Sequence, residues 1–340
     1  MNELPSISVV IPTLNASRVL ESCLSSIAEQ DYPKGLIEII VADGGSVDGT
    51  VAIAEKYGAK VFPNPLKTGE AGKAVAIKQA KNELIALIDS DNILPQKDWF
   101  LRMVEPFADS EIIGAEPIEY TWRKEDGFIT RYCALIGMND PLCLFLGNYD
   151  RYSWLTDRWT GLQVDSHDRN GWLKVTFIDA VLPTIGANGT IFRGRVLEEL
   201  GGGQRFFDID ILPRAIKSWG KASIAKVKVG IVHLYCGSSL KMFTKKQDRR
   251  ISDFVFNQNT GGRAYEWHKQ NKKGLIKFVI YSITFFPPLL QSLRGYLRKP
   301  DRAWFFHPLA CFLTLFVYTR GVLTGLRSPR EANRQAYSQG

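Results

Sequence analysis

The first ninety residues alternate between apolar runs and helical patterns. Ile7 to Ile11 is dominated by β-branched residues and closed by Pro12, and Ile37 to Ala42 is a similar run that ends at Asp43. Neither run has the polar alternation of a half-exposed strand, so both predict strands buried on two faces. The other elements predicted here are helices over 16–29, 50–57 and 71–81 and strands over 60–62 and 84–88. Strands separated by helices predict an α/β fold with a mostly parallel sheet covered on both faces.

After Phe107 the pattern loosens into aromatic-rich sequence from Tyr120 to Phe177, which we expect to shape the site of a second substrate. The elements expected beyond it are a strand near 178–182 and helices over 195–200 and 212–219. Two apolar stretches, over 276–293 and 303–318, close the chain. We find no internal repeat or low-complexity segment.

The charge of the chain is unevenly distributed. Of 340 residues, 45% are hydrophobic and 23% charged, which is ordinary for a globular protein, and the net charge is +8. Residues 241–340 carry 18 Lys and Arg against 5 Asp and Glu, a net charge of +13, which leaves −5 for residues 1–240. A basic tail with long apolar stretches favours anionic lipid over nucleic acid, because a nucleic-acid arm does not need them. We therefore expect a membrane partner and no nucleic acid.

The two closing apolar stretches are at or below the roughly 20 residues that a spanning helix needs. In a transmembrane hairpin with a cytoplasmic catalytic domain, the connecting loop with Arg294, Arg298 and Lys299 would lie outside, against the positive-inside tendency. We therefore expect helices that lie in the membrane interface, anchored by Trp304, Phe305 and Phe306. The alternative is a pair of buried helices in a soluble domain.

Five scattered cysteines include no Cys-x-x-Cys pair, so we expect reduced structural thiols rather than a disulfide framework or a zinc site. The first five residues lack the positive leader and apolar region of a secretory signal. We therefore expect the catalytic part of the chain at the cytoplasmic face of the membrane.

Two carboxylates, Asp89 and Asp91, follow directly on the apolar run that ends at Ile88. Ionised groups at the end of a buried strand cost several kcal/mol unless a cation or hydrogen-bond donors compensate them. Hard oxygen ligands suit Mn²⁺ or Mg²⁺, and these ions suit a diphosphate. The pair therefore predicts a metal-held nucleotide substrate at the carboxyl ends of the strands.

The order of the motifs resembles the inverting family 2 glycosyltransferases, which have the Rossmann-like GT-A fold. The resemblance covers about residues 5–250. The residues that carry it are Val9 to Asn15, Val41 to Thr50, Asp89-Ser90-Asp91, Gly201-Gly202, and Phe207 to Arg214. The resemblance implies a metal-dependent enzyme that transfers a sugar from a nucleotide-diphosphate sugar, with a UDP-sugar favoured.

The first motifs carry the nucleotide in that family. The resemblance places the nucleotide base on Pro12, Thr13, Asn15 and Asp43. A carboxylate at a strand end can accept a hydrogen bond from a base imide, and Gly44-Gly45 permits the backbone to approach the base closely. A simple turn is the alternative, because Asp-Gly-Gly-Ser is common turn chemistry. Asp48 is expected to cap the helix that begins near Gly49.

The resemblance implies that Asp89 contacts the donor and that Asp91 binds the metal. Lys73, at the start of a helix, can meet the donor phosphate or ribose, although a solvated helix-end lysine is equally consistent with the sequence. His233 follows an apolar strand and resembles the third metal ligand of many GT-A enzymes; a purely structural histidine is the alternative.

Inversion by single displacement needs one carboxylate as general base. Family members usually supply it from a Glu-Asp pair before a helix, but here Phe207 occupies the Glu position. We assign the base to Asp208, with Asp210 in reserve; the alternative is that both only cap the helix at Leu212.

Residues 245–251 resemble, with Ile251 in place of Trp, the Gln-x-x-Arg-Trp motif of membrane-bound polysaccharide synthases. Lys246, Arg249 and Arg250 are therefore candidates to neutralise the departing diphosphate, with a juxtamembrane basic patch as the alternative. Asn139 and Asp140 are candidates for the acceptor site.

These interpretations divide the chain into 1–110, the nucleotide-sugar half of the GT-A domain, 111–250, the acceptor and catalytic half, and 251–340, a membrane-associating helical region. The membrane-seeking tail favours a lipid-linked acceptor, such as a polyprenyl-diphosphate saccharide, over a soluble one. Two alternatives remain. A nucleotidyltransferase would need a Gly-rich phosphate loop after the first strand. A non-catalytic membrane-bound scaffold would not need acidic residues such as Asp89, Asp91 and Asp208.

Overall fold

The computed structural model describes residues 3–178, 181–260 and 271–325, with side chains described up to residue 256 in the second range. The chain forms two compact units, one of residues 1–118 and 164–233 and one of residues 119–163 and 234–340. The expected boundaries at 110 and 250 do not coincide with this division. The chain leaves the first unit, returns to it and leaves again, and hydrophobic periodicity does not reveal such a crossing.

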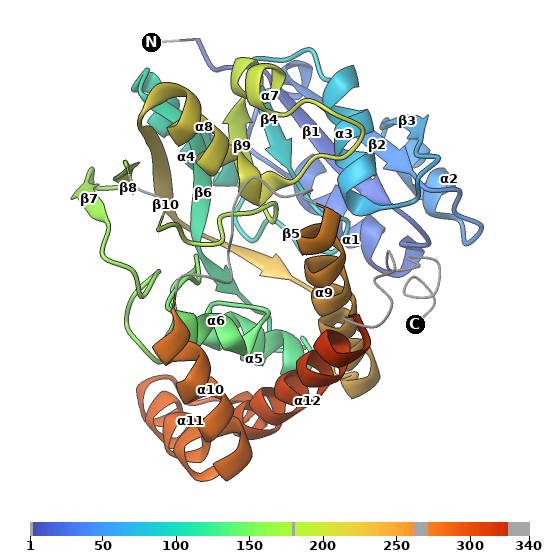
Figure 1. The fold of residues 1–340 in the computed structure, drawn as a ribbon. Coiled ribbons are helices and arrows are strands. Elements are labelled where there is room, and N and C mark those ends of the chain that lie inside the picture. Colours follow the sequence, from blue (N-terminus) through green and yellow to red (C-terminus); the bar gives the residue numbers. More distant parts are fainter. Residues whose placement is uncertain (1–2, 179–180, 261–270, 326–340) are drawn as a thin grey trace. The chain divides into compact units, whose positions relative to one another are not determined.

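The first unit is built around one sheet in the order β3-β2-β1-β4-β9-β6-β10-β8-β7, with β5 paired to β10 (Figure 1). The first four strands pair in parallel, as expected. β4 is buried at every position, which explains its continuous apolar sequence. Their bounds are β1 Ile7–Thr13, β2 Ile37–Asp43, β3 Lys60–Pro63 and β4 Leu84–Leu87.

The sheet is mixed rather than mostly parallel, because β9 pairs antiparallel with β4 and further antiparallel pairs follow. The expected strand near 178–182 is wrong for the described residues: β8 ends at Phe177, and Ile178 is 67% exposed. The bounds are β5 Asn92–Ile93, β6 Ile112–Thr121, β7 Asp165–Asp168, β8 Trp172–Phe177, β9 Thr190–Arg193 and β10 Ala222–His233.

Helices flank this sheet, and their buried faces follow the apolar positions of the sequence. α1 buries Leu20, Leu24 and Ile27, which the sequence places on one face. α3 packs against β1 and β2, whereas α4 and α8 pack against β10. The bounds are α1 Ser17–Ala28, α2 Thr50–Lys56, α3 Gly69–Gln79, α4 Trp99–Val104, α7 Gly194–Leu200 and α8 Ile211–Trp219, with 3₁₀ turns at Lys34–Leu36, Glu105–Ala108 and Asp208–Asp210.

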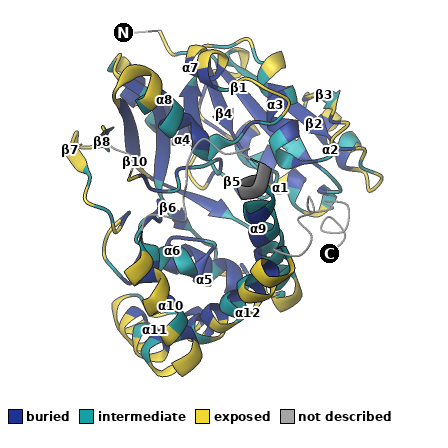
Figure 2. Cartoon of the chain, viewed as in Figure 1, coloured by how far each residue is buried: buried dark blue, intermediate teal, exposed yellow. Residues whose placement is uncertain are grey.

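The second unit is helical outside the end of β6. Its helices are α5 Phe128–Ile136, α6 Pro141–Leu146, α9 Leu240–Thr260, α10 Lys272–Thr284, α11 Phe286–Arg298 and α12 His307–Gly325, with a 3₁₀ turn, η5, at Arg302–Phe306. Figure 2 shows extensive exposed surface on α10 and α11 and buried residues along α5. In the described part of the chain, one helical stretch, Arg302–Gly325, is long and apolar enough to cross a membrane, and α10 with α11 passes the same test only as a pair bent by 94°.

The expectation that Trp304 and Phe306 anchor the chain in a membrane is wrong. Both side chains lie in the core of this unit, with Trp304 fully buried, and only Phe305 is exposed. The Trp304 ring packs on Gly295 so closely that a Cβ there would lie 2.6 Å from ring atoms. Its indole N–H donates to the carbonyl of Lys299 at 2.9 Å, so the ring joins η5 to α11.

Candidate active site

The carboxylate of Asp43, at the end of β2, organises the loop that follows. It accepts hydrogen bonds from the backbone amides of Gly45 and Ser46 at 2.9 and 2.8 Å, and from the hydroxyls of Ser46 and Thr13 at 2.6 and 2.9 Å. Thr13 ends β1, so the contact joins two neighbouring strand ends. The turn chemistry expected of this sequence is therefore present, and it also fixes the orientation of a largely buried carboxylate.

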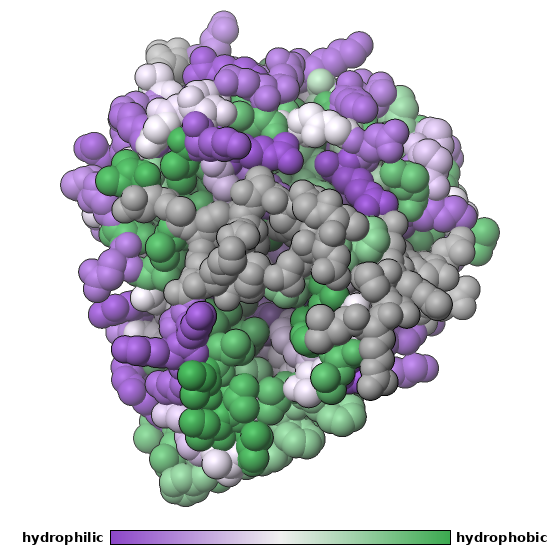
Figure 3. All heavy atoms as spheres, viewed as in Figure 1, coloured by the Kyte–Doolittle hydropathy of each residue, from purple (hydrophilic) through white to green (hydrophobic). Residues whose placement is uncertain are grey.

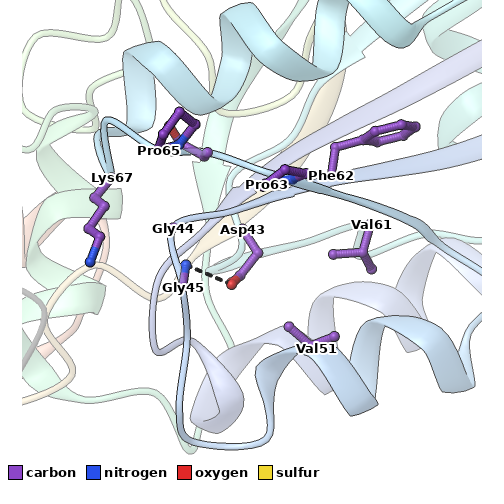
Figure 4. Close-up of a pocket in the computed structure, with 10 residues that line it drawn as sticks. Asp43, Gly44, Gly45, Val51, Val61, Phe62, Pro63, Pro65 and Lys67 are labelled. Atoms are coloured by element: carbon purple, nitrogen blue, oxygen red, sulfur yellow. Dashed lines mark hydrogen bonds between the residues drawn. The ribbon is translucent and has the colours of Figure 1, made fainter.

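Asp43 lines a pocket of about 380 Å³ (Figure 4). Apolar side chains such as Val61 and Phe62 form part of the wall, and Lys67 stands at one edge. This mixture of apolar wall and few polar groups suits a planar heterocycle. Sequence reasoning missed Lys67 and Phe62, because a short strand and a Pro-rich loop carry no signal for a ligand wall.

The loop after β1 contacts the Asp43 loop through Asn15, which has a positive φ of 51°. The backbone N–H of Asn15 donates to the Ser46 hydroxyl at 2.8 Å, and its side-chain carbonyl accepts from Val47 N–H at 3.0 Å. Pro12 packs so closely on Gly72 of α3 that a Cβ at Gly72 would lie 2.8 Å from the proline ring. In the structure, Pro12, Thr13, Asn15 and Asp43 thus belong to two linked loops at the ends of β1 and β2.

Asp48 accepts hydrogen bonds from the first residues of two helices. Its carboxylate takes the backbone N–H of Thr50 at 3.2 Å and that of Ser17 at 3.1 Å, together with the Thr50 hydroxyl. Burial alone would raise the pKa of Asp48, but these hydrogen bonds outweigh it and lower the pKa to about 2. Its structural role therefore extends from α2 to α1.

The turn that carries Asp89 and Asp91 is closed by Asn92. The side-chain carbonyl of Asn92 accepts from Asp89 N–H at 3.0 Å, and the Asn92 backbone N–H donates to the Asp89 carbonyl at 2.9 Å. The Asn92 side-chain amide donates to Asn188 at 3.0 Å. Below the turn lies the buried thiol of Cys23, whose pKa is raised by burial and by the neighbouring carboxylates. None of the five cysteines forms a disulfide.

Asp91 and His233 lie side by side. The two-residue strand β5 pairs antiparallel with the end of β10, with Asn92 opposite His233. This pairing brings the imidazole Nε2 of His233 to 3.3 Å from a carboxylate oxygen of Asp91. Both side chains retain some exposure: 21% for Asp91 and 10% for His233.

The residues present fit a divalent cation held jointly with a substrate. Among the described residues there is no group of three or more His, Cys, Asp or Glu arranged to bind a metal ion alone. A carboxylate oxygen and an imidazole nitrogen, on side chains that keep some exposure, suit Mn²⁺ or Mg²⁺, which usually bind few protein ligands and share substrate phosphates. Asp91 and His233 are the residues that would hold it.

Lys73, on the second turn of α3, joins the Asp89 turn to Asp208. Its ammonium lies 2.9 Å from a carboxylate oxygen of Asp208 and 3.6 Å from one of Asp89. Burial alone would lower the pKa of Lys73, but the two carboxylates raise it above its ordinary value. Burial raises the pKa of Asp89, an effect that Lys73 opposes and that Asp91 and Asp208 reinforce. Lys73 is thus a buried ammonium between acids, not the solvated lysine that the sequence also allowed.

Asp208 and Asp210 differ in exposure. The Asp208 side chain is 20% exposed, whereas Asp210 is fully buried. Asp210 precedes α8 without a capping hydrogen bond from its side chain. Of the two predicted bases, Asp208 is the one that an acceptor can approach directly.

The remaining predicted residues lie in the second unit. The Gln247 amide donates to the Asn139 carbonyl at 2.8 Å, and Arg250 donates to the Gln247 side chain at 2.7 Å. Asp140 accepts from Leu142 N–H, which caps α6, and from the Tyr318 hydroxyl at 2.6 Å. Asn139, Asp140 and Arg250 thus belong to one network that joins α6, α9 and α12.

The other two basic candidates share α9 with Arg250. The ammonium of Lys246 donates to the backbone carbonyl of Tyr235 and lies 4.3 Å from the centre of the Tyr235 ring. Arg249 is partly exposed. Their contact with a donor diphosphate stays a prediction.

The first part of the chain is similar to known proteins. Residues 8–131 match the model of glycosyl transferase family 2. Glycosyltransferase AglE of Haloferax volcanii is 27% identical over 143 residues, which are 40% of this chain and 46% of that protein. Poly(ribitol-phosphate) beta-N-acetylglucosaminyltransferase TarS of Staphylococcus aureus is 39% identical over 93 residues, 26% of this chain and 16% of that one. The chain thus spans less than half the length of these relatives.

A solved structure has the same fold over nearly the whole chain. Mannosyltransferase PcManGT from Pyrobaculum calidifontis, determined with GDP-Man and Mn²⁺, superposes with a TM-score of 0.54 and 17% sequence identity, and the match covers 94% of this chain and 88% of that one. The comparisons confirm the resemblance to family 2 glycosyltransferases and the GT-A fold.

Proposed function

We propose, on the premise that residues 8–131 carry the family 2 glycosyltransferase sequence, that this protein is a metal-dependent inverting glycosyltransferase that moves a sugar from a nucleotide-diphosphate sugar to a lipid-linked acceptor in glycan assembly. The observation that carries the proposal is the grouping of the Asp91–His233 pair and the Lys73–Asp208 pair around the turn after β4. The pocket at Asp43 lies at the end of β2, and β1 separates β2 from β4 in the sheet.

The pocket at Asp43 would receive the base. All four hydrogen bonds to this carboxylate come from its own loop and from Thr13, so a base imide must displace one donor. The hydroxyls of Thr13 and Ser46 can turn away, whereas the amides of Gly45 and Ser46 are fixed by the backbone. UDP is the favoured nucleotide because uracil presents one imide donor between two carbonyl acceptors. The Asp43 carboxylate can accept from the imide, and nearby backbone amides can donate to the carbonyls.

A divalent ion bound by Asp91 and His233 would neutralise the departing diphosphate. Lys73 supplies a second positive charge from the protein itself. In the structure its ammonium is engaged by Asp208 and Asp89, so a diphosphate competes with these carboxylates for it. A donor that draws Lys73 away from Asp208 leaves that carboxylate able to accept a proton.

Asp208 would then act as the general base. Its carboxylate takes the proton of the acceptor hydroxyl while the acceptor oxygen bonds to the anomeric carbon and the bond from that carbon to the diphosphate oxygen breaks. Attack from the face opposite the leaving group inverts the anomeric configuration. The nucleoside diphosphate leaves with the electron pair of the broken bond.

The test is the product released from each of several nucleotide sugars, with Mn²⁺ and a membrane lipid extract as the source of acceptor. We expect a nucleoside diphosphate and a glycosylated lipid, with a UDP-sugar as the best donor. In a parallel reaction with nucleoside triphosphates and a sugar 1-phosphate, release of pyrophosphate would mark a nucleotidyltransferase instead. Absence of both products and of donor binding would indicate a non-catalytic scaffold.

A further inference from the structure

Exposed apolar side chains are concentrated on one part of the second unit. Of the large apolar side chains that are exposed in the described part of the chain, 17 of 24 lie between residues 275 and 323, on α10, α11, η5 and α12. Figure 3 shows hydrophobic residues gathered over α10 and α11. The most exposed include Ile283, Phe286 and Leu297, at 62%, 64% and 83%. Monomeric soluble proteins rarely expose apolar side chains on this scale, and a surface of this kind is typical of a site of protein or membrane contact.

The net positive charge around this surface favours an anionic partner. Residues 271–325 contain eight Lys and Arg but a single acid, Asp301, which pairs with Arg131 at 3.1 Å. The ammonium of Lys299, at the end of α11, lies 4.6 Å from the centre of the Trp154 ring and 5.6 Å from that of Trp122. Tryptophan rings beside cations at the edge of an apolar surface are typical of the level of lipid headgroups.

The shape of α10 and α11 is unsuited to crossing a bilayer. Each helix has 13 residues, about 20 Å of helix against a hydrocarbon core of about 30 Å. They meet at 94°, because Phe285 has a positive φ of 59° and Pro287 and Pro288 begin the second helix. A pair bent in this way can lie along a membrane with both apolar faces in one leaflet.

α12 is long enough to span, but its neighbour α9 is polar. Arg320 of α12 pairs with Asp248 of α9 at 2.6 Å, and the Tyr318 hydroxyl oxygen lies 3.1 Å from the side-chain oxygen of Gln247. Ile251 of α9 packs on Gly321, so the two helices lie side by side. A spanning α12 would carry Arg320 and its partner, Asp248 of α9, toward hydrocarbon, which costs several kcal/mol for each charge.

We propose that α10, α11 and the first half of α12 form a monotopic membrane-docking surface that enters one leaflet of an anionic bilayer without crossing it. The apolar faces lie at the headgroup and acyl boundary, and the Lys and Arg side chains contact the headgroups. This inference deepens the proposed function by specifying how the chain reaches a lipid-linked acceptor, but it rests on the second unit alone.

Flotation of the full chain with vesicles tests the docking. We expect it to float with vesicles of phosphatidylcholine containing 30% phosphatidylglycerol and far less with phosphatidylcholine alone. The double variant Ile283→Glu, Phe286→Glu should partition about tenfold more weakly or worse, whereas Ile178→Glu, which changes an equally exposed residue of the first unit, should float as the parent does. A parent chain that stays at the bottom of the gradient, or equal loss in both variants, would overturn the proposal.

Cysteine labelling distinguishes docking from spanning. Pro300→Cys and Thr324→Cys introduce thiols at exposed positions on the two sides of the candidate span, with the parent chain as background for its native cysteines. In sealed inside-out membrane vesicles, a membrane-impermeant maleimide should label both without detergent. Protection of either thiol until detergent is added would contradict a monotopic arrangement.

Donor hydrolysis by the same variants separates this inference from the proposed function. If Ile283→Glu, Phe286→Glu no longer floats but still hydrolyses the nucleotide sugar, docking and chemistry are separate, as expected. If the parent chain floats but releases no nucleoside diphosphate, the sugar-transfer proposal fails while the docking surface stands.

Discussion

Lys73 and Asp208 are 135 residues apart in the sequence, yet the Lys73 ammonium lies 2.9 Å from the Asp208 carboxylate. The contact joins the start of α3 to the 3₁₀ turn before α8, and therefore the expected phosphate-binding side of the site to the expected base. In the proposed function, a diphosphate would compete with Asp208 for this buried ammonium, which would couple donor binding to release of the base.

Removal of the Lys73 charge should weaken the use of the sugar donor. We expect Lys73→Met to lower kcat/KM for the donor by about 10²-fold, because a charge-assisted contact to the leaving diphosphate is lost. The acids around it keep the pKa of Lys73 above its ordinary value, so the group should not titrate in the activity profile between pH 6 and 9. Lys78→Met, on the exposed last turn of α3, is the control. Equal activities of the two variants would remove Lys73 from the mechanism.

Replacement of the base should separate chemistry from binding. Asp208→Asn should reduce sugar transfer by about 10³-fold or more while the thermal shift caused by Mn²⁺ and the nucleoside diphosphate persists. Asp210→Asn should retain more transfer activity, because Asp210 is fully buried. If Asp210→Asn loses transfer and Asp208→Asn retains it, the base is Asp210.

A buried ion pair supports the sheet beneath the site. Lys226 on β10 and Glu116 on β6 pair with both side chains fully buried. Glu116→Leu alone should lower the free energy of unfolding by about 3–5 kcal/mol, because it leaves a buried charge, whereas adding Lys226→Met should restore most of it. Denaturant unfolding of the single and double variants measures this. A double variant as unstable as the single one would show that packing, not charge, sets the cost.

Asp48 should make stability depend on acid. Its pKa of about 2 in the folded chain lies below the ordinary Asp value of 3.8, so its contribution is complete above pH 5 and is lost as the pH falls toward 2. Asp48→Asn should cost about 0.5–1 kcal/mol at pH 7, a small amount because the side chain is exposed. Unfolding curves between pH 7 and 3 should show the difference shrinking, and an unchanged gap at pH 3 would contradict this.

The sequence predicted the parallel strands, the turn after β4 and the Asp43 loop, because each depends on local pattern and on the rule that strand ends meet at one edge. It could not predict the contact of Lys73 with Asp208, which depends on how distant segments pack. The pairing of Asp91 with His233 follows from the register of β5, a strand of two residues that is too short to show a pattern.

The errors have related physical causes. Trp304 and Phe306 are amphipathic or apolar residues in a basic segment, and such residues suit a membrane interface as well as a protein core. Both are buried in the structure, where the Trp304 ring packs closely on Gly295. The apolar stretch near Ile178 reads as a strand, but β8 ends one residue earlier, at Phe177. Local pattern does not specify which of two adjacent apolar stretches pairs with β10.

The central claim is that Asp91 and His233 hold a divalent cation against the diphosphate of a nucleotide sugar. The most direct measurement is a crystal structure of the full chain with Mn²⁺ and a nucleoside diphosphate, with the metal located by anomalous scattering. We predict one peak at about 2.0–2.3 Å from a carboxylate oxygen of Asp91 and from a ring nitrogen of His233, with phosphate oxygens completing its coordination. A nucleotide bound with no metal at this pair, or with its metal elsewhere, would contradict the account.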